Sequence, residues 1–303
     1  MHRRHAIRRR TLAALAAALL ITGTAAAAED FERLQGLLRL ANLNPEEATP
    51  ADHIYFKNEI VYCTGTSDLA TANNAAAAKM EQGDYAGAAA LLDKTLPNAS
   101  LFFPFRYNLG TCHQHLNQLR KAMLNYRKAQ AVVPEYWGTY IQMGWIYQRW
   151  YRDNEAIESY REALRRKRNE LDTYVLIGDL FFNRGQVQLA KKYYDQSLSI
   201  NHRFNNGILG RAKVHFKEGE YYKAMVTLKS IDIREAYDKS YHFYYAETAF
   251  KLQDYETAAH HYTTLLSYRT DRFFLTHSVS LIEHKLALSK RFVEKIIRKG
   301  GGS

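Results

Sequence analysis

Residues 137–170 read WGTYIQMGWIYQRWYRDNEAIESYREALRRKRNE, and two small residues in this stretch decide the fold. Gly144 is the eighth residue of the stretch and Ala156 is the twentieth. The stretch is also rich in Trp and Tyr, so its rings could form a core or a binding surface. Because small side chains let two helices approach closely, Gly144 and Ala156 predict a contact between two antiparallel helices.

The same two small positions recur along the chain at a step of 34 residues. The full set of pairs is Ala76 with Ala88, Gly110 with Ala122, Gly144 with Ala156, Gly178 with Ala190, Ala212 with Ala224, and Ala246 with Ala258. Six units without insertion or deletion thus cover residues 69–272. Their first residues are Leu69, Phe103, Trp137, Leu171, Asn205 and Lys239. Self-similarity at a fixed period of this length predicts a repeat architecture.

Most units carry a turn signal in their middle, such as Gly83-Asp84-Tyr85 or Gly219-Glu220-Tyr221. Each unit is therefore predicted to be a helix, a tight turn and a second helix. A large residue follows the second small residue by four positions and so lies on the same helical face. We expect this residue to pack between neighbouring units; it is Tyr126, Tyr160, Tyr194, Leu228 and Tyr262 in the last five units.

This pattern closely resembles the tetratricopeptide repeat family. That family has Leu-Gly at positions seven and eight, aromatic residues at four, eleven and twenty-four, and Ala at twenty. The unit from Trp137 matches it with Tyr140, Gly144, Tyr147, Ala156, Tyr160 and Ala163. The first, fifth and sixth units depart most, since they have Ala in place of Gly at position eight. The resemblance covers residues 69–272 and implies an all-α solenoid, a right-handed superhelix of helix-turn-helix repeats.

The first 28 residues have the features of a secretory signal peptide. MHRRHAIRRR is basic, the apolar run from Thr11 to Thr24 is too short to span a bilayer comfortably, and Ala26 and Ala28 are spaced for a signal peptidase. We expect cleavage after Ala28; an uncleaved anchor is the alternative and would need a longer apolar run. The expected location is periplasmic or secreted, with no integral membrane segment after cleavage.

The regions on either side of the repeats are expected to cover the ends of the solenoid, because terminal repeats would otherwise expose apolar faces. Residues 29–68 are predicted to form N-terminal accessory helices. Residues 273–299 follow helical spacing and are predicted to form one or two C-terminal capping helices. Residues 300–303, Gly-Gly-Gly-Ser, are expected to be a flexible tail.

The charge of the chain argues against a nucleic-acid partner. Removal of residues 1–28 lowers the formal net charge from +11 to +6, because that segment holds five Arg and no acid. The densest basic cluster, residues 161–168, lies where a helix should end, and its cations complement the negative end of the helix dipole. A nucleic-acid binder usually gathers its cations on one face.

The two cysteines leave two interpretations open. In an oxidising compartment Cys63 and Cys112 could form one disulfide. They could equally be two buried thiols that act as small apolar residues.

The sequence contains no pattern typical of an enzyme. It has no metalloprotease motif, no Gly-rich phosphate loop and no nucleophile elbow. The neighbouring histidines His260 and His261 point about 100° apart on a helix and cannot chelate one metal well. We therefore expect no catalytic residue, no metal site and no cofactor.

The resemblance does imply a binding surface, because in this family the first helix of each unit lines a concave groove. The implied partner-binding residues are Asn74, Tyr107, Asn108, Gln142, Trp145, Gln148, Phe182, Asn183, Lys213 and Phe216. Side-chain amides can pair with the backbone of an extended peptide, and aromatic faces can bury its apolar side chains. The alternative for the aromatic residues is packing between first helices.

These features predict a non-enzymatic protein-protein interaction scaffold of the cell envelope that binds a partner protein or extended peptide in the groove. Two alternatives remain open at this stage. The chain could be a structural subunit of an envelope-spanning machine that uses its convex and end surfaces, or a carrier of an apolar small ligand. The sequence does not identify the partner or the oligomeric state.

Overall fold

The structure is a computed structural model, and it describes residues 54–64, 67–95, 102–232, 239–268 and 278–300. The chain divides into two compact units, residues 1–168 and 169–303, and each is described by itself below. The predicted signal peptide and residues 29–53 lie outside the described residues. So do residues 273–277 of the predicted C-terminal cap and 301–303 of the predicted tail.

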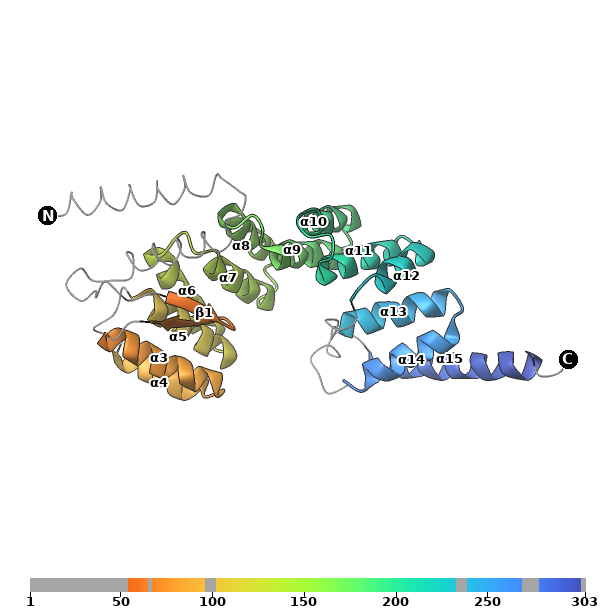
Figure 1. The fold of residues 1–303 in the computed structure, drawn as a ribbon, viewed down its shortest axis with the longest axis horizontal. Helices are drawn as coiled ribbons and strands as arrows, with labels where there is room; N and C mark the ends of the chain where they lie inside the picture. Colours follow the sequence, from red (N-terminus) through yellow and green to blue (C-terminus); the bar gives the residue numbers. More distant parts are fainter. Residues whose placement is uncertain (1–53, 65–66, 96–101, 233–238, 269–277, 301–303) are drawn as a thin grey trace. The chain divides into compact units, whose positions relative to one another are not determined.

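The first unit contains a two-stranded hairpin and three helical pairs (Figure 1). The strands are β1 (Ile54–Lys57) and β2 (Ile60–Cys63), which pair antiparallel with Tyr55 opposite Tyr62. The helical pairs are α3 (Asp68–Glu81) with α4 (Tyr85–Thr95), α5 (Phe103–His115) with α6 (Leu119–Val132), and α7 (Trp137–Arg149) with α8 (Asp153–Arg166).

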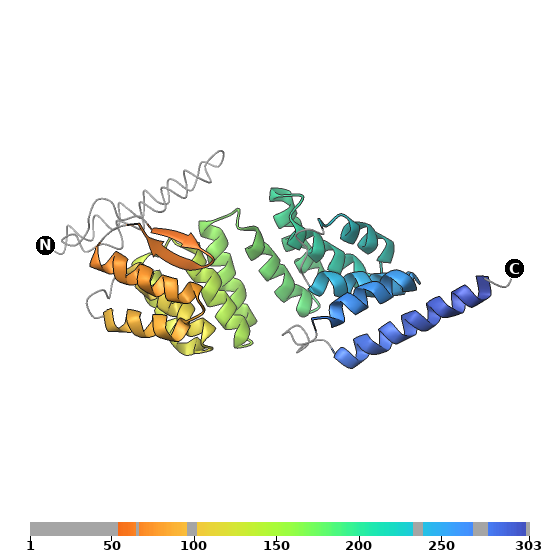
Figure 2. The ribbon, with the colours of Figure 1, turned by 60° about the horizontal axis from the view of Figure 1, so that its bottom comes forward.

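The second unit contains three more helical pairs and a longer last helix (Figure 2). The pairs are α9 (Leu171–Asn183) with α10 (Val187–Ile200), α11 (Asn205–Lys217) with α12 (Tyr221–Lys229), and α13 (Lys239–Lys251) with α14 (Tyr255–Leu266). The last helix is α15 (Val279–Gly300), which packs against α14. Apart from the hairpin, every described element is a helix, so the fold is all-α.

A residue in the left-handed region ends the first helix of every pair. The six residues are Gly83, Asn117, Tyr151, Gly185, Gly219 and Gln253, and their φ angles lie between 57° and 80°. They are spaced by 34 residues, so the turn geometry repeats even where the sequence has no glycine. Tyr151 has this left-handed backbone conformation, and its side chain is 93% exposed. Tyr151 therefore belongs to the turn and does not pack in the core.

The small residue at position eight makes room for an aromatic ring. A Cβ on Gly144 would stand 2.5 Å from the ring of Tyr160, and Gly110 and Gly178 meet Tyr126 and Tyr194 in the same way. These tyrosine side chains are fully buried. The ring therefore takes the space that a methyl group would need.

Residues 54–63 are not helical, and for them the prediction of N-terminal accessory helices is wrong. The two strands consist mostly of β-branched and aromatic residues, which favour a strand. The turn between them is Asn58-Glu59, with φ angles of 48° and 65°. Two residues with positive φ are what a two-residue hairpin of the favoured twist requires.

Among the described residues, no helix is long and apolar enough to cross a membrane.

Candidate partner-binding groove

The first helices of the three pairs in the first unit, α3, α5 and α7, carry the groove residues predicted for that unit. Strand β2 lies against two of these helices, α3 and α5. Its four residues are all buried, and the side chain of Val61 is fully so. The chain's own strand therefore occupies the groove in the first two repeats.

Asparagine side chains hold this strand by its backbone. Asn108 accepts a hydrogen bond from the Val61 amide at 2.9 Å and donates one to the Val61 carbonyl at 2.8 Å. Asn74 does the same at Cys63, with distances of 2.9 Å and 2.6 Å. Asn73 adds a third donor, whose nitrogen lies 2.8 Å from the Val61 carbonyl oxygen. Each amide thus pairs with a peptide group as a neighbouring strand would.

Aromatic rings close the same site. The ring of Phe56 in β1 stacks on Tyr136 at 4.6 Å and meets the edge of Tyr107 at 5.6 Å. The side chain of Tyr107 is 2% exposed. Asn74, Tyr107 and Asn108 were expected to contact a partner. The structure places them on the first helices, where all three contact the chain's own hairpin. The ring of Tyr107 also packs against rings of the repeats.

In the third repeat of the first unit, the predicted groove residues make contacts within the chain, but one of them also remains partly exposed. Gln142 is buried and accepts a hydrogen bond from Gln114 at 2.9 Å. Gln148 accepts one from the Tyr160 hydroxyl at 2.6 Å. Trp145 is half-buried against the core, and the guanidinium of Arg149 lies 5.5 Å from the centre of its ring. Trp145 is therefore both a packing residue and part of the surface.

The groove face of the second unit is aromatic. It is formed by the first helices α9, α11 and α13, together with Tyr221 at the start of α12. We call Phe182, Phe216, Tyr221 and Tyr244 the aromatic cluster. Tyr244 stands at its centre, with its ring 6.4 Å from that of Phe182 and 5.7 Å from that of Phe216. All four rings are half-buried. A side chain of α9 thus meets one of α13 over α11.

Charged residues at position nine of the repeats lie near the aromatic cluster. Lys213 donates to Asp179 at 3.0 Å, and Lys285 of α15 donates to both oxygens of Glu247 at 2.6 Å. The buried tyrosine of the second helix also reaches each acid: Tyr194 donates to Asp179 and Tyr262 to Glu247. These charges are thus paired within the described chain.

The pKa of Tyr244 is raised to about 12, because burial and the carboxylates of Asp179 and Glu247 oppose its ionisation. Asn183 and Lys217, one position after Phe182 and Phe216, are exposed. The second unit therefore offers rings and paired charges, with exposed polar residues along one margin. Lys285 was not predicted, and the 34-residue repeat does not point to it, since it lies 38 residues after Glu247 while Lys213 lies 34 after Asp179.

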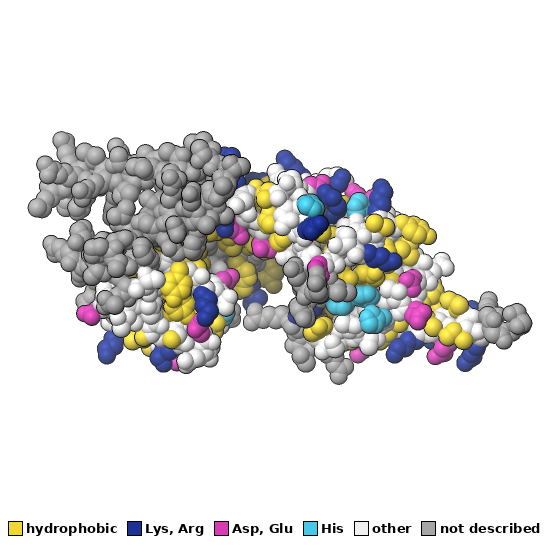
Figure 3. All heavy atoms as spheres, viewed as in Figure 1, with side chains coloured by type: hydrophobic (Ala, Val, Ile, Leu, Met, Phe, Trp, Pro, Cys, Tyr) yellow, Lys and Arg dark blue, Asp and Glu magenta, His cyan; other side chains and the backbone are white. Residues whose placement is uncertain are grey.

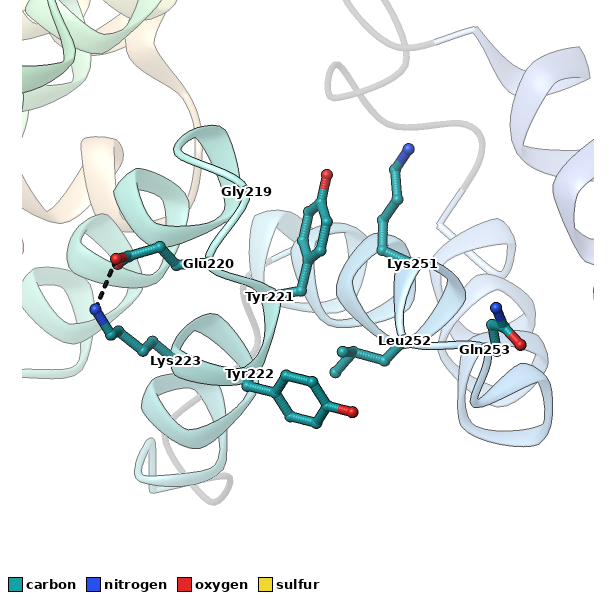
Figure 4. Close-up of a pocket in the computed structure, with 8 residues that line it drawn as sticks. All are labelled: Gly219, Glu220, Tyr221, Tyr222, Lys223, Lys251, Leu252 and Gln253. Carbon is teal, nitrogen blue, oxygen red and sulfur yellow. Dashed lines mark hydrogen bonds and ion pairs between the residues drawn. The ribbon is translucent and has the colours of Figure 1, made fainter.

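The aromatic cluster leads to a pocket at the interhelical turns (Figure 4). Tyr221 meets the edge of Phe216 at 5.6 Å and forms one wall, with Lys251 beside it. The pocket has a volume of about 690 Å³ and is also lined by Tyr222, Leu252 and Gln253. It is open, and its lining combines charged residues such as Glu220 and Lys223 with the side chains of Tyr221 and Leu252.

The other site predictions concern cysteine and metal. Cys63 and Cys112 are both buried and are not joined in a disulfide, so of the two interpretations the structure shows two buried thiols. Burial raises the pKa of the Cys112 thiol to about 12.

One described cluster has the ligand types for a metal ion, namely His215, Glu218 and Glu220, whose ligand atoms lie within 4.8 Å of one another. His215 already bonds Glu220 at 2.8 Å, and Glu220 also pairs with Lys223. Glu218 accepts a hydrogen bond from Gln188 at 2.8 Å. The contacts of this cluster are therefore accounted for without a metal.

Comparison with known proteins supports the repeat interpretation. The family profile described as Tetratricopeptide repeat matches residues 138–170 and 171–202. PilW, described as a widely conserved type IV pilus biogenesis factor, is 18% identical with a TM-score of 0.56, and the match covers 70% of this chain and 96% of that one. For pilF of Pseudomonas aeruginosa the identity is 19% and the TM-score 0.56, over 66% and 90% of the two chains.

A third solved structure of this kind is the Cut9-Hcn1 hetero-tetramer of the APC/C, with 14% identity and a TM-score of 0.59 over 75% of this chain and 46% of that chain. No curated protein matches the sequence. At these identities the solved structures show a common fold. Residues 138–202 are therefore tetratricopeptide repeats, and the described chain has the all-α fold of tetratricopeptide repeat solenoids.

Proposed function

We propose that this chain is a non-enzymatic scaffold of the cell envelope that binds an extended segment of a partner protein on the groove face of its second unit. The observation that carries the proposal is the difference between the two groove faces. In the first unit, Asn74 and Asn108 hold the chain's own strand. In the second unit the equivalent face presents the aromatic cluster, whose rings are half-buried.

The hairpin in the first unit indicates what kind of ligand such a groove holds. An extended backbone lies across the first helices, polar side chains pair with its peptide groups, and rings cover its side chains. The second unit has the rings but few groove amides, so apolar side chains of the ligand would contribute more there. The exposed Lys217 and Lys251 at its margin favour acidic residues in the ligand.

The envelope location rests on the sequence of residues 1–28 alone. PilW, which shares the fold at 18% identity, is described as a type IV pilus biogenesis factor. Mass spectrometry of the N-terminus of the chain purified from its own cells tests export. A mature chain that begins at Glu29 is expected, and one that retains residues 1–28 would contradict this part of the proposal.

Site-specific photo-crosslinking tests the groove itself. A photoreactive amino acid at Asn183, which is exposed on the groove face, is expected to crosslink the partner. The same amino acid at Val226, which is 70% exposed on the second helix α12, serves as the matched control and is expected to crosslink less.

The crosslinked segment is then made as a peptide, and its affinity is measured for the wild-type chain. The Phe182→Ala/Phe216→Ala variant is expected to bind at least about tenfold more weakly, since buried rings dominate such interfaces. Lys217→Glu, at an exposed position, repeats the test without disturbing the core. Crosslinking from Val226 alone, with unchanged affinity of both groove variants, would favour a structural subunit that uses its convex surface.

A further inference from the structure

The last helix, α15, is longer than the helix on which it packs. The ring of Phe292 stacks on Tyr255, the first residue of α14, at 4.5 Å. Because α14 begins there, residues 293–300 of α15 extend beyond it. Both ribbon views show α15 continuing past the end of α14 (Figures 1 and 2). We call residues 293–300 the overhang.

The apolar face of α15 does not stop where α14 stops. Ile282 is 1% exposed and Ser289 is fully buried against the second unit. The same helical face continues through Val293 to Ile296 and Ile297, which are 58% and 66% exposed. Figure 3 shows hydrophobic side chains along α15 up to the grey tail, with charged side chains next to them. The overhang thus extends the packing face into solvent as far as the described residues show.

The charges around this face are mostly positive. Between residues 290 and 299 the sequence has Lys290, Arg291, Lys295, Arg298 and Lys299 against a single acid, Glu294. Lys290, Lys295 and Arg298 are exposed. A second copy of the same overhang would bring cations against cations, which disfavours pairing of two copies. A partner with acidic residues beside an apolar stripe complements both the charge and the apolar surface of the overhang.

The step between α14 and the overhang also selects the shape of the partner. The apolar face of the overhang points to the same side on which α14 lies, so a flat surface such as a bilayer would collide with α14 before it reached Ile296. A rod of the diameter of one helix fits into the layer that α14 leaves. We propose that the overhang of α15 binds an acidic amphipathic helix of a partner protein, which continues the layer of α14.

A pair of synthetic helical peptides tests this proposal on the full chain. Both carry Leu at helical spacing on one face; one has Glu at the flanking positions and the other has Lys there. Fluorescence anisotropy is expected to show binding of the Glu peptide at least about tenfold tighter than the Lys peptide, with a loss of affinity as salt rises. Equal binding of the two peptides, or binding of neither, overturns the proposal.

Variants then place the peptide on the overhang. Ile296→Asp/Ile297→Asp is expected to weaken the Glu peptide at least about tenfold, because it removes the exposed apolar stripe. Lys295→Glu/Arg298→Glu is expected to weaken it and to reduce its salt dependence. Val226→Asp, an equally exposed position on α12, is the control and is expected to bind as the wild type does.

Two other occupants give distinct results. If the wild type is a dimer by light scattering and Ile296→Asp/Ile297→Asp is a monomer, the face pairs with a second copy. If phosphatidylglycerol vesicles bind the wild-type chain and not this variant, both begun at Glu29 so that residues 1–28 do not contribute, the face binds lipid. Either result overturns the proposal. The groove variant Phe182→Ala/Phe216→Ala leaves the overhang intact, so it is expected to bind the Glu peptide as the wild type does. The proposal for the overhang and the proposal for the groove can therefore be contradicted separately.

Discussion

Gly144 and Tyr160 form a pair in which one residue is small because the other is large. A Cβ on residue 144 would lie only 2.5 Å from the ring of Tyr160. Where position eight is Ala76 or Ala212, the residue at position twenty-four is Leu92 or Leu228. The sixth unit, which has Ala246 with Tyr262, is the exception. The pairing of Gly with Tyr and Ala with Leu is thus a packing rule for most units.

This rule predicts a compensated double substitution. Gly144→Ala is expected to lower the free energy of unfolding by about 1–3 kcal/mol through overpacking. Gly144→Ala/Tyr160→Leu recreates the pair of the first unit and is expected to lose less than the sum of its single variants, by about 1 kcal/mol or more. Urea unfolding measures all four chains.

The control for this cycle is Gly185→Ala in the α9–α10 turn. No atom lies within 4 Å of its added Cβ, but its φ of +74° strains any other residue. Its cost is expected to be unchanged by Tyr160→Leu. Strict additivity in the Gly144 and Tyr160 cycle would contradict the packing rule.

His261 is expected to make the second unit less stable in acid. It is buried between α13 and α14, with the ring of Tyr245 stacked on it at 4.1 Å and Nδ1 of His242 at 2.9 Å from its own Nδ1. Burial, and next the neighbouring His242 and His260, lower its pKa from 6.5 to about 4. The unfolded chain therefore binds a proton at a higher pH than the folded chain does.

The expected result is a loss of stability as the pH falls from about 6.5 towards about 4. The stability that this group contributes is complete above the unfolded pKa, and its full loss would be about 3 kcal/mol. His261→Gln is expected to lose less between pH values of about 7 and 5 than the wild type does. His284→Gln, at an exposed position on α15, is the control; if His261→Gln shows the wild-type pH dependence, the assignment to His261 is wrong.

At the scale of elements, the hairpin is held by groove amides that can be removed one by one. Asn108→Ala/Asn74→Ala deletes the pairs that bind Val61 and Cys63, and each buried backbone group left without a partner costs about 1–3 kcal/mol. The hairpin is therefore expected to detach more often, exposing the Cys63 thiol. Reaction with Ellman's reagent, in a Cys112→Ser background, is expected to be at least about tenfold faster than with the asparagines intact.

The matching control keeps Cys112 and replaces Cys63 by Ser. Cys112 lies within α5 and is fully buried, so its reaction rate is expected to change much less. Equal acceleration at both thiols would indicate that the whole unit has loosened. Unchanged reaction of Cys63 would show that the asparagines do not hold the strand.

The helices could be predicted from sequence, while the hairpin could not. The positions of Gly144 and Ala156 predicted a helical pair, and α7 and α8 begin and end around them. The strands around Asn58 and Glu59 have only four residues each, and their turn lacks the Gly that signals a tight hairpin. A strand this short becomes stable only on a surface formed by other residues, which a local pattern does not contain.

The groove was predictable as a surface but not as an occupied one. Amide positions such as Asn108 followed from the resemblance to the repeat family, and the structure places them on the first helices. Their ligand was hidden because it lies 47 residues away in the same chain. The rings of residues 137–170 have different roles: Tyr160 is core, Tyr151 is exposed at a turn, and Trp145 is both packed and accessible.

At the scale of the whole molecule, each unit has its own core. One core joins residues from Ile54 to Ile146, and the other joins residues from Leu198 to Ile282. In repeat proteins most stabilising contacts are between neighbours, so damage in one place is expected to spread over a limited distance.

Hydrogen exchange tests how far such damage spreads. Leu228→Ala removes a fully buried side chain of α12 and is expected to cost about 2–5 kcal/mol. Amides of α11 to α14 are expected to exchange faster, while those of α3 to α6 keep their protection. Ala86→Gly, at an exposed position of α4, is the reciprocal test in the first unit. It is expected to speed exchange in the first unit and to leave exchange in the second unit unchanged. Equal loss of protection throughout the chain would mean that it unfolds as a single cooperative body.

The clamp on β2 has a consequence for the newborn chain. Synthesis proceeds from the N-terminus, so Val61 emerges from the ribosome well before Asn108, its partner 47 residues later. During that interval the strand has open hydrogen-bonding groups, and such an edge is a template for joining other strands. Only when α5 has emerged can the asparagines shield it. The first repeats thus cover, once folded, the strand that is synthesised just before them.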